Sequence, residues 1–111
     1  MKKQLIVLLL LSIATTCFAL TESFGPEYDE ITTFFQGEDE PDALDAMWDS
    51  KSLLKIGVFD NGKGYDSYAQ HACEIIRDKG IQGENVTVQV IDIKKLAHFE
   101  EWVVLGNAQC Q

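Results

Sequence analysis

Apolar residues recur at steps of three and four between Tyr65 and Gly80, and this spacing predicts an amphipathic helix. Acidic Asp66 lies in the first turn, and basic Arg77 and Lys79 lie in the last, which is the order that the helix dipole favours. Gly80 suits the left-handed residue that commonly ends a helix. The residues that share the apolar face are Tyr65, Tyr68, Ala69, Ala72, Cys73 and Ile76.

Three shorter stretches follow the two-residue period of β-strands. They span residues 53–60 before the helix and residues 85–93 and 101–110 after it. Short connections between strand, helix and strand predict a right-handed crossover and a parallel pair. The seven-residue connection 94–100 is too short for another crossover, so we expect an antiparallel third strand. The pattern predicts a small two-layer β-α-β-β domain of the α+β or α/β class, with a three-stranded mixed sheet.

One face of this sheet is expected to pack against the helix. In the third strand, Trp102, Val104, Ala108 and Cys110 share a face. Because Cys73 lies on the apolar face of the helix, Cys73 and Cys110 both point into the layer between helix and sheet, and we predict a disulfide between them. The chain-entropy estimate for a loop of this length is about 4 kcal/mol. The first two strands contribute Leu54, Ile56, Val58, Val86, Val88 and Val90 to the same layer.

The other face of the predicted sheet has no helix of its own domain to cover it. Either the segment that precedes the domain covers this face, or another molecule does. We therefore interpret it as a possible partner-binding face, for another protein of the cell envelope or for a second copy of the chain in a homodimer. The residues expected on this face are Leu53, Phe59, Ile91, Ile93, Val103 and Leu105.

Residues 20–50 carry ten acidic side chains and no basic one. Disordered acidic tails are usually poor in aromatic residues, whereas Tyr28, Ile31, Phe34 and Phe35 fit one helical stripe here. Pro41 suits the first turn of a second short helix, with Leu44, Met47 and Trp48 on one face. We expect a partly helical acidic segment before a domain of residues 51–111. It would serve as a cover for the sheet or as a docking surface for a basic partner.

Residues 1–19 have the pattern of a secretory signal peptide. Two lysines precede the uncharged stretch 5–20, which is too short to span a bilayer, and cleavage after Ala19 fits the small residues there. We expect a bacterial protein that is periplasmic or secreted and has no stable membrane insertion after cleavage. In a lipoprotein alternative, Cys17 would be lipidated, although Thr16 fits poorly before a lipidated cysteine.

Charge and cysteine content exclude some functions. The chain has a formal net charge of −9 at pH 7, and removal of Lys2 and Lys3 with the signal peptide lowers it to −11. This charge repels phosphates, so nucleic acid is not expected as a partner, and neither is an anionic membrane surface. Cys73 and Cys110 remain after cleavage, as in other small exported domains that a disulfide stabilises.

No residue pattern specifies a catalytic site, a metal site or a cofactor. Residues 61–64 are rich in glycine but lack a complete phosphate-binding motif. The acidic residues 38–42 lack the ligand spacing of an EF-hand. His71 and His98 are the two histidines, and they leave one alternative open, a small periplasmic hydrolase with a histidine base. The leading expectation is a non-enzymatic binding protein of the envelope, without metal or cofactor.

Overall fold

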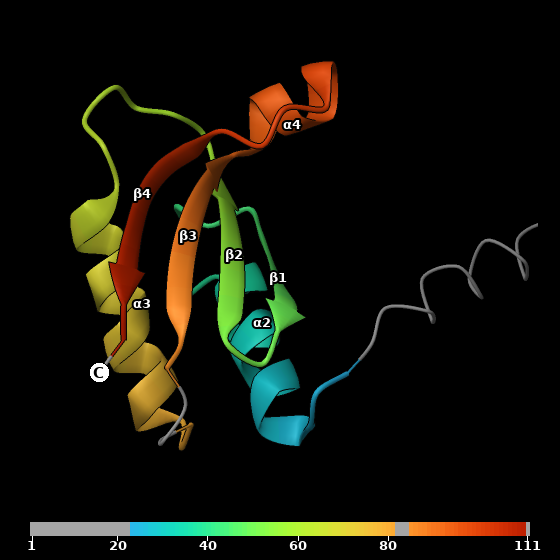
Figure 1. The fold of residues 1–111 in the computed structure, drawn as a ribbon, viewed down its shortest axis with the longest axis vertical. Coiled ribbons are helices and arrows are strands. Elements are labelled where there is room, and N and C mark those ends of the chain that lie inside the picture. The colour runs from blue at the N-terminus through green and yellow to red at the C-terminus, as the bar shows by residue number, and fades with distance from the viewer. Residues whose placement is uncertain (1–22, 82–84, 111) are drawn as a thin grey trace, which may run out of the picture.

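The computed structural model describes residues 23–81 and 85–110 (Figure 1). The strands form one sheet in the order β1-β2-β3-β4. The predicted α+β class is confirmed, but the sheet has four strands instead of three. The expected signal peptide and Cys17 lie outside the described residues. The elements are α2 (Pro26–Gln36), β1 (Asp45–Ser50), β2 (Leu53–Val58), α3 (Asp66–Asp78), β3 (Thr87–Asp92), α4 (Ile93–Phe99) and β4 (Val104–Gln109).

The sheet is mixed, with a parallel pair at its centre. Strands β2 and β3 are parallel and are joined by α3, while β1 and β4 run antiparallel to their neighbours at the two edges. The predicted crossover and the predicted antiparallel last strand are both present. Helices α2 and α3 lie behind the sheet in the view of Figure 1, and α4 lies at the end of β3. The molecule thus has a helical layer on one side of its sheet.

The hydrophobic core fills the space between the sheet and helices α2 and α3. The two predicted central strands bury the side chains that alternation assigned to this layer, which are Leu54, Ile56, Val58, Val86, Val88 and Val90. Helix α3 faces them with Ala69, Ala72 and Ile76, and the two alanines allow a close approach of helix and sheet. Helix α2 adds the fully buried Ile31 and Phe35.

The expected second helix of the acidic segment is instead strand β1. Met47 pairs with Lys55 of β2, and Trp48 pairs with Leu54. The exposed fraction is 40% for Met47 and 7% for Trp48, so neighbouring residues lie on opposite faces, as in a strand. Pairing with β2 therefore overrides the helix-start pattern around Pro41. The boundary expected between residues 50 and 51 falls inside the β1–β2 hairpin, and the acidic segment is part of the sheet.

The connection expected over residues 94–100 contains helix α4. The carboxylate of Asp92 accepts hydrogen bonds from the backbone amides of Lys94 and Lys95 at 3.0 and 3.1 Å, as an N-terminal helix cap does. The helix ends at Glu100, which has a φ of 56°. Ile93 therefore begins a helix, although strand alternation predicted it as part of the preceding strand.

Strand β4 contains a bulge that changes which side chains face the core. The register shifts at Leu105, between the pairs Val90–Gly106 and Ile91–Val104. One extra residue reverses the alternation of the strand. Ala108 and the half-buried Cys110 keep their predicted place on the helical side. The prediction was wrong for Val104 and Trp102, which lie on the opposite side of the sheet.

Candidate binding surface

The sheet face that points away from α2 and α3 is here called the open face. Within the described residues, only the short helix α4 packs on it, at the end of β2 and β3 (Figure 1). The half of the open face that is farther from α4 is polar. There the side-chain amide of Gln109 donates a hydrogen bond of 2.9 Å to the hydroxyl of Thr87. The half near α4 is apolar. Alternation assigns to the open face Asp45, Met47, Asp49, Leu53, Lys55, Gly57, Thr87, Gln89, Ile91, Trp102, Val104, Asn107 and Gln109.

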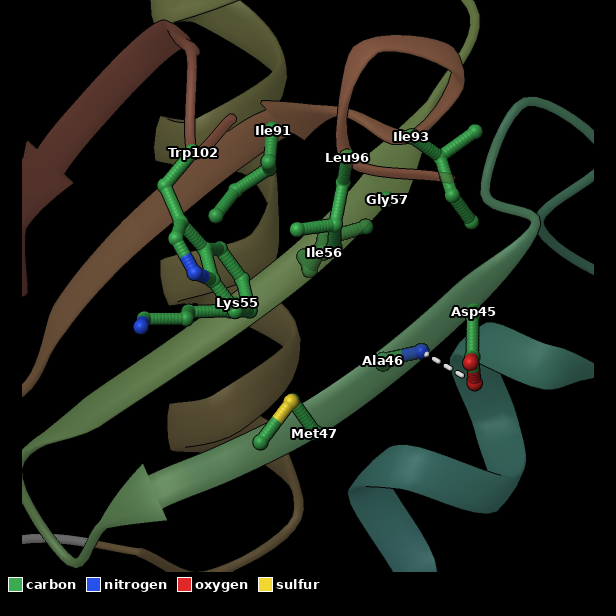
Figure 2. Close-up of a pocket in the computed structure, with 10 residues that line it drawn as sticks. All are labelled: Asp45, Ala46, Met47, Lys55, Ile56, Gly57, Ile91, Ile93, Leu96 and Trp102. Carbon is green, nitrogen blue, oxygen red and sulfur yellow. Dashed lines mark hydrogen bonds between the residues drawn. The ribbon is translucent and has the colours of Figure 1, made fainter. Parts of the chain in front are cut away.

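A shallow hollow of about 60 Å³ lies in the apolar half of the open face (Figure 2). Its walls come from β1, β3, α4 and the segment before β4. Figure 2 shows their side chains around a central space over β2. The walls are formed by Met47, Ile91, Ile93, Leu96 and Trp102.

Gly57 positions α4 beside this hollow. A Cβ atom at Gly57 would lie 2.9 Å from Cδ1 of Ile93, which is closer than real Cβ contacts. The missing side chain therefore lets Ile93 rest on β2, and it brings Leu96 of the same helix to the wall of the hollow. The hollow depends on this glycine as well as on its apolar walls.

Trp102 is an exposed aromatic side chain held in a defined position. Its exposed fraction is 52%, and Nζ of Lys55 lies 4.1 Å from its ring centroid. The same Nζ lies 3.8 Å from Oδ2 of Asp49, so the lysine bridges the ring and a carboxylate. An aromatic ring that is both exposed and positioned is typical of residues that dominate protein interfaces.

The size of the hollow restricts what it can bind. Small-molecule sites usually measure about 300–1,000 Å³, and the hollow has about 60 Å³. One water molecule needs about 10–15 Å³ of such space, so the hollow accommodates a group of a few heavy atoms, which is the size of a side chain. The hollow is therefore smaller than the usual site for a metabolite.

A second, polar depression of about 590 Å³ lies beyond the ends of β2 and β3. Ligands often bind at the carboxyl ends of parallel strands. The carboxylate of Asp92, however, is engaged in capping α4. The described residues that line the depression include no serine, threonine or cysteine beside His98, as a hydrolase with a nucleophile would require. Its lining is Phe59, Asp60, Asp92, Lys94 and His98.

The other histidine takes part in a contact between two segments. Nε2 of His71 lies 3.3 Å from Oε2 of Glu40, and the Tyr68 hydroxyl donates a hydrogen bond of 2.8 Å to Oε1 of the same carboxylate. Burial and then the hydrogen bond to Glu40 raise the pKa of Tyr68 above its ordinary value. The hydrogen bond from the phenol to Glu40 fixes the loop after α2 to α3. This arrangement explains His71 without a catalytic role.

The described ranges also bear on metal binding and on membrane insertion. No group of three or more histidine, cysteine, aspartate or glutamate side chains there is arranged to hold a metal ion. None of the helices in that part of the chain is both long and apolar enough to cross a bilayer.

The six residues predicted for a partner-binding face lie in different parts of the structure. Ile91 and Ile93 line the hollow. Leu53 lies half-buried on the open face, away from the hollow, and Val103 is half-buried without lining it. Phe59 is 61% exposed and borders the polar depression. Leu105 packs against the core because of the bulge.

Three wall residues of the hollow were missed from the sequence, and one of them had a signal. Ala46, Met47 and Trp48 are three apolar residues in a row, so no two-residue alternation assigned Met47 to a face. Gly106 inside a strand is a common mark of a bulge, and a bulge there changes the face of Trp102. Leu96 had no such signal, because its position depends on how α4 packs on Gly57.

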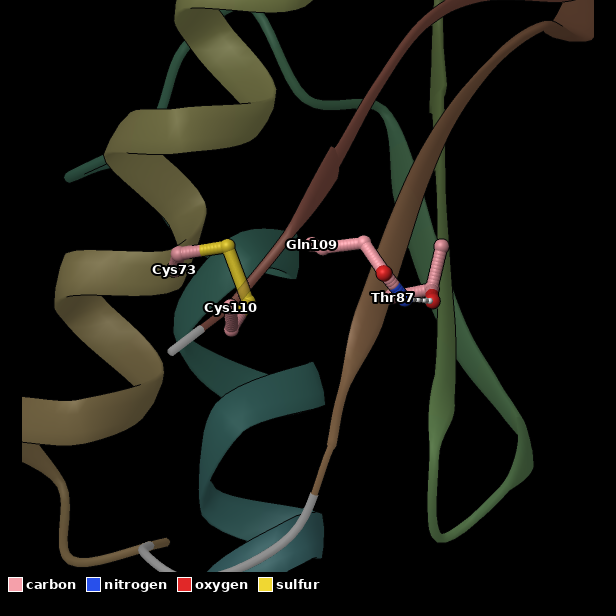
Figure 3. Close-up of a disulfide and its surroundings, with 4 residues drawn as sticks. All are labelled: Cys73, Thr87, Gln109 and Cys110. Atoms are coloured by element: carbon pink, nitrogen blue, oxygen red, sulfur yellow. Dashed lines mark hydrogen bonds between the residues drawn. A yellow bond between two sulfur atoms is a disulfide. The ribbon is translucent and has the colours of Figure 1, made fainter.

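The two remaining predicted site residues, Cys73 and Cys110, lie on the helical side of the sheet (Figure 3). Their sulfur atoms are 2.08 Å apart and their Cα atoms 5.1 Å apart, so the predicted pair lies at disulfide distance. The backbone amide of Cys110 donates to the carbonyl of Val86 at 2.7 Å. The bridge thus joins α3 to the residue after β4, and it leaves the open face unobstructed.

The chain was compared with protein-family models, with curated proteins and with solved structures. None of the three comparisons finds a match.

Proposed function

We propose that this protein is a small exported, non-enzymatic interaction protein that binds a partner protein through the open face of its sheet. The observation that carries this proposal is the hollow beside Trp102. It is formed in the free chain, it is apolar, and it has the size of one side chain. Such a hole next to an exposed aromatic ring is how the energetic centre of a protein interface is commonly built.

The exposed apolar side chains around the hollow support the same function. Met47 and Trp102 are 40% and 52% exposed, and both are walls of the hollow. Apolar groups scattered singly over a surface need no explanation, whereas neighbouring ones on one face mark interaction sites. The shape and the composition of this face therefore favour a protein partner.

Export is part of the proposal and has two supports. The first is the signal-peptide pattern of residues 1–19. The second is the disulfide, since such bonds persist in oxidising compartments such as the bacterial periplasm and the cell exterior. We place the protein in one of these two compartments, where its partner is another envelope or secreted protein.

Replacement of Trp102 by alanine tests the proposed surface. The protein purified after export is immobilised and exposed to a graded series of envelope extract from the same bacterium. We expect W102A to need at least about tenfold more extract than the unchanged protein to retain the same partner, because truncation at the centre of an interface often costs more than 1–2 kcal/mol. Circular dichroism checks that W102A is folded.

Gln70 on the outer face of α3 provides the matched control, since it is exposed and lies on the opposite side of the molecule. Q70A should retain the partner as the unchanged protein does. Equal retention by W102A, or a loss caused by Q70A alone, would contradict binding through the open face.

A further inference from the structure

We infer that the partner of the open face is a cationic protein segment that places one aliphatic side chain in the hollow. This inference rests on the proposed function and adds the chemistry of the partner to it. It follows from the position of the hollow relative to the charges of the chain and from its small, apolar interior.

The hollow adjoins the most acidic part of the molecule. Residues 23–50 carry nine acidic side chains and no basic one. They form α2, the following loop and β1. Helix α2 lies behind the sheet (Figure 1), and Glu40 holds the loop to α3. Asp45 and Asp49 of the edge strand β1 are the acids that alternation places on the open face, and they are here called the acidic edge. Asp45 of β1 belongs to the lining of the hollow, and Figure 2 shows its carboxylate turned toward the amide of Ala46.

Most of this acidic charge has no neighbouring cation within the described residues. The lysine salt bridges found there pair Asp49 with Lys55 and Glu30 with Lys79. Asp45, at the hollow, accepts hydrogen bonds from the Gln36 side chain and from its neighbour's backbone amide, at 2.9 and 2.8 Å. Both donors are neutral, so the negative charge at this rim remains available to an incoming lysine or arginine.

The negative charge of the chain disfavours a second copy as the molecule that binds the open face. Each chain carries a formal net charge of −9, and contact between two open faces would bring two acidic edges together. Like charges at an interface disfavour association, whereas opposite charges speed the encounter of two proteins. An anionic lipid surface is disfavoured for the same reason. A basic protein segment has the complementary charge.

The apolar lining decides which side chain enters. Met47, Ile91, Ile93 and Leu96 offer aliphatic or thioether surfaces, and the volume of about 60 Å³ fits one branched aliphatic group. A lysine or arginine tip in the hollow would lose water without gaining a partner. The basic residues of the partner therefore belong beside the inserted side chain, over Asp45 and the acidic edge.

Selection from a random linear peptide library displayed on phage tests this inference directly. The protein purified after export serves as the target at low salt. We expect the selected peptides to combine lysine or arginine with one leucine, isoleucine or valine. Synthetic copies should bind at least about tenfold more weakly to W102A, and also to M47D, which adds negative charge while removing an apolar wall. Peptide affinity should fall as salt rises.

A matched pair of charge variants separates the effect of a charge at the acidic edge from the effect of the net charge of the protein. D45N keeps an acceptor for Gln36 and should weaken peptide binding by about threefold at low salt. D78N changes the net charge equally but lies exposed near the end of α3, and it should have less than about half that effect. Equal effects of the two variants would contradict a role for the acidic edge.

The remaining outcomes have distinct meanings. Peptides that are neutral or acidic, yet sensitive to W102A, would overturn the cationic partner and leave the proposed open-face function standing. Basic peptides that are insensitive to W102A and M47D would overturn both. A stable dimer of the free protein in sedimentation equilibrium, lost in M47D, would replace the cationic segment by a second copy. Recovery of no binding peptide would count against the inference.

Discussion

Replacement of Cys73 and Cys110 by alanine is expected to lower the free energy of unfolding by about 4 kcal/mol. The two residues are 37 positions apart. In the chain-entropy account, a cross-link that closes a loop of this length lowers the entropy of the unfolded chain, and this stabilises the fold by about 4 kcal/mol. The free energy of unfolding of a small domain is about 5–15 kcal/mol, so the expected loss is a large part of the total stability. The bridge joins α3 to the end of β4, and β4 forms an edge of the sheet.

Urea denaturation followed by far-ultraviolet circular dichroism measures this effect on protein purified after export. Q70A on the exposed side of α3 serves as the control, because this change removes no cross-link. We expect the midpoint of the double alanine variant to fall strongly and that of Q70A to stay near the original. Coincident transitions for all three proteins would show that the bridge does not restrain the unfolded chain.

Replacement of Gly106 by alanine is expected to destabilise the protein by about 3 kcal/mol or more. The added Cβ would overlap the carbonyl carbon of Tyr65 and would lie 2.5 Å from the amide nitrogen of Asp66. Both are backbone atoms at the start of α3, so no side-chain rotation relieves the contact and the helix has to move away from β4. Two hydrogen bonds join these segments, Tyr65 N to Leu105 O and Asn107 N to Asp66 Oδ1, at 3.1 and 2.9 Å.

The same denaturation experiment with G37A as the matched control tests this prediction. A Cβ at Gly37 would have its nearest neighbour at 3.4 Å, and the residue has a φ of −93°, which any residue adopts. G37A should therefore unfold close to the original midpoint, while G106A unfolds at clearly lower urea. If G106A were as stable as G37A, the close contact between α3 and β4 would be wrong.

The parts of the fold that were predictable from the sequence are those with a strong local signal. Helix α3 has an apolar stripe, charges in the order of its dipole and a terminal glycine within one short stretch. The two central strands are continuous runs of β-branched and aliphatic residues. The cysteine pairing followed from the face of Cys73 on α3 and from that of Cys110 after the bulge of the last strand, and both faces were assigned correctly.

The parts that were not predictable depend on contacts between distant segments. Pro41 and the acids around it suit a helix start, and only pairing with β2 makes the next residues a strand. The bulge at Leu105 lets Gly106 stay against α3 while Trp102 turns to the other side. The hollow depends on both features, because Met47 belongs to β1 and the bulge determines which side of the sheet Trp102 faces. The face predicted from alternation alone therefore included only Ile91 and Ile93 among the walls of the hollow.

Site-specific photo-crosslinking in living cells tests binding through the open face most directly. A photoreactive amino acid is introduced at Met47 in one protein and at Gln70 in another, each expressed from the full chain and exported. We predict that illumination links the Met47 variant to one envelope or secreted protein through a basic segment, and that the Gln70 variant forms no such product. A product from Gln70 alone, or the absence of any product from Met47, would contradict the proposed open-face function.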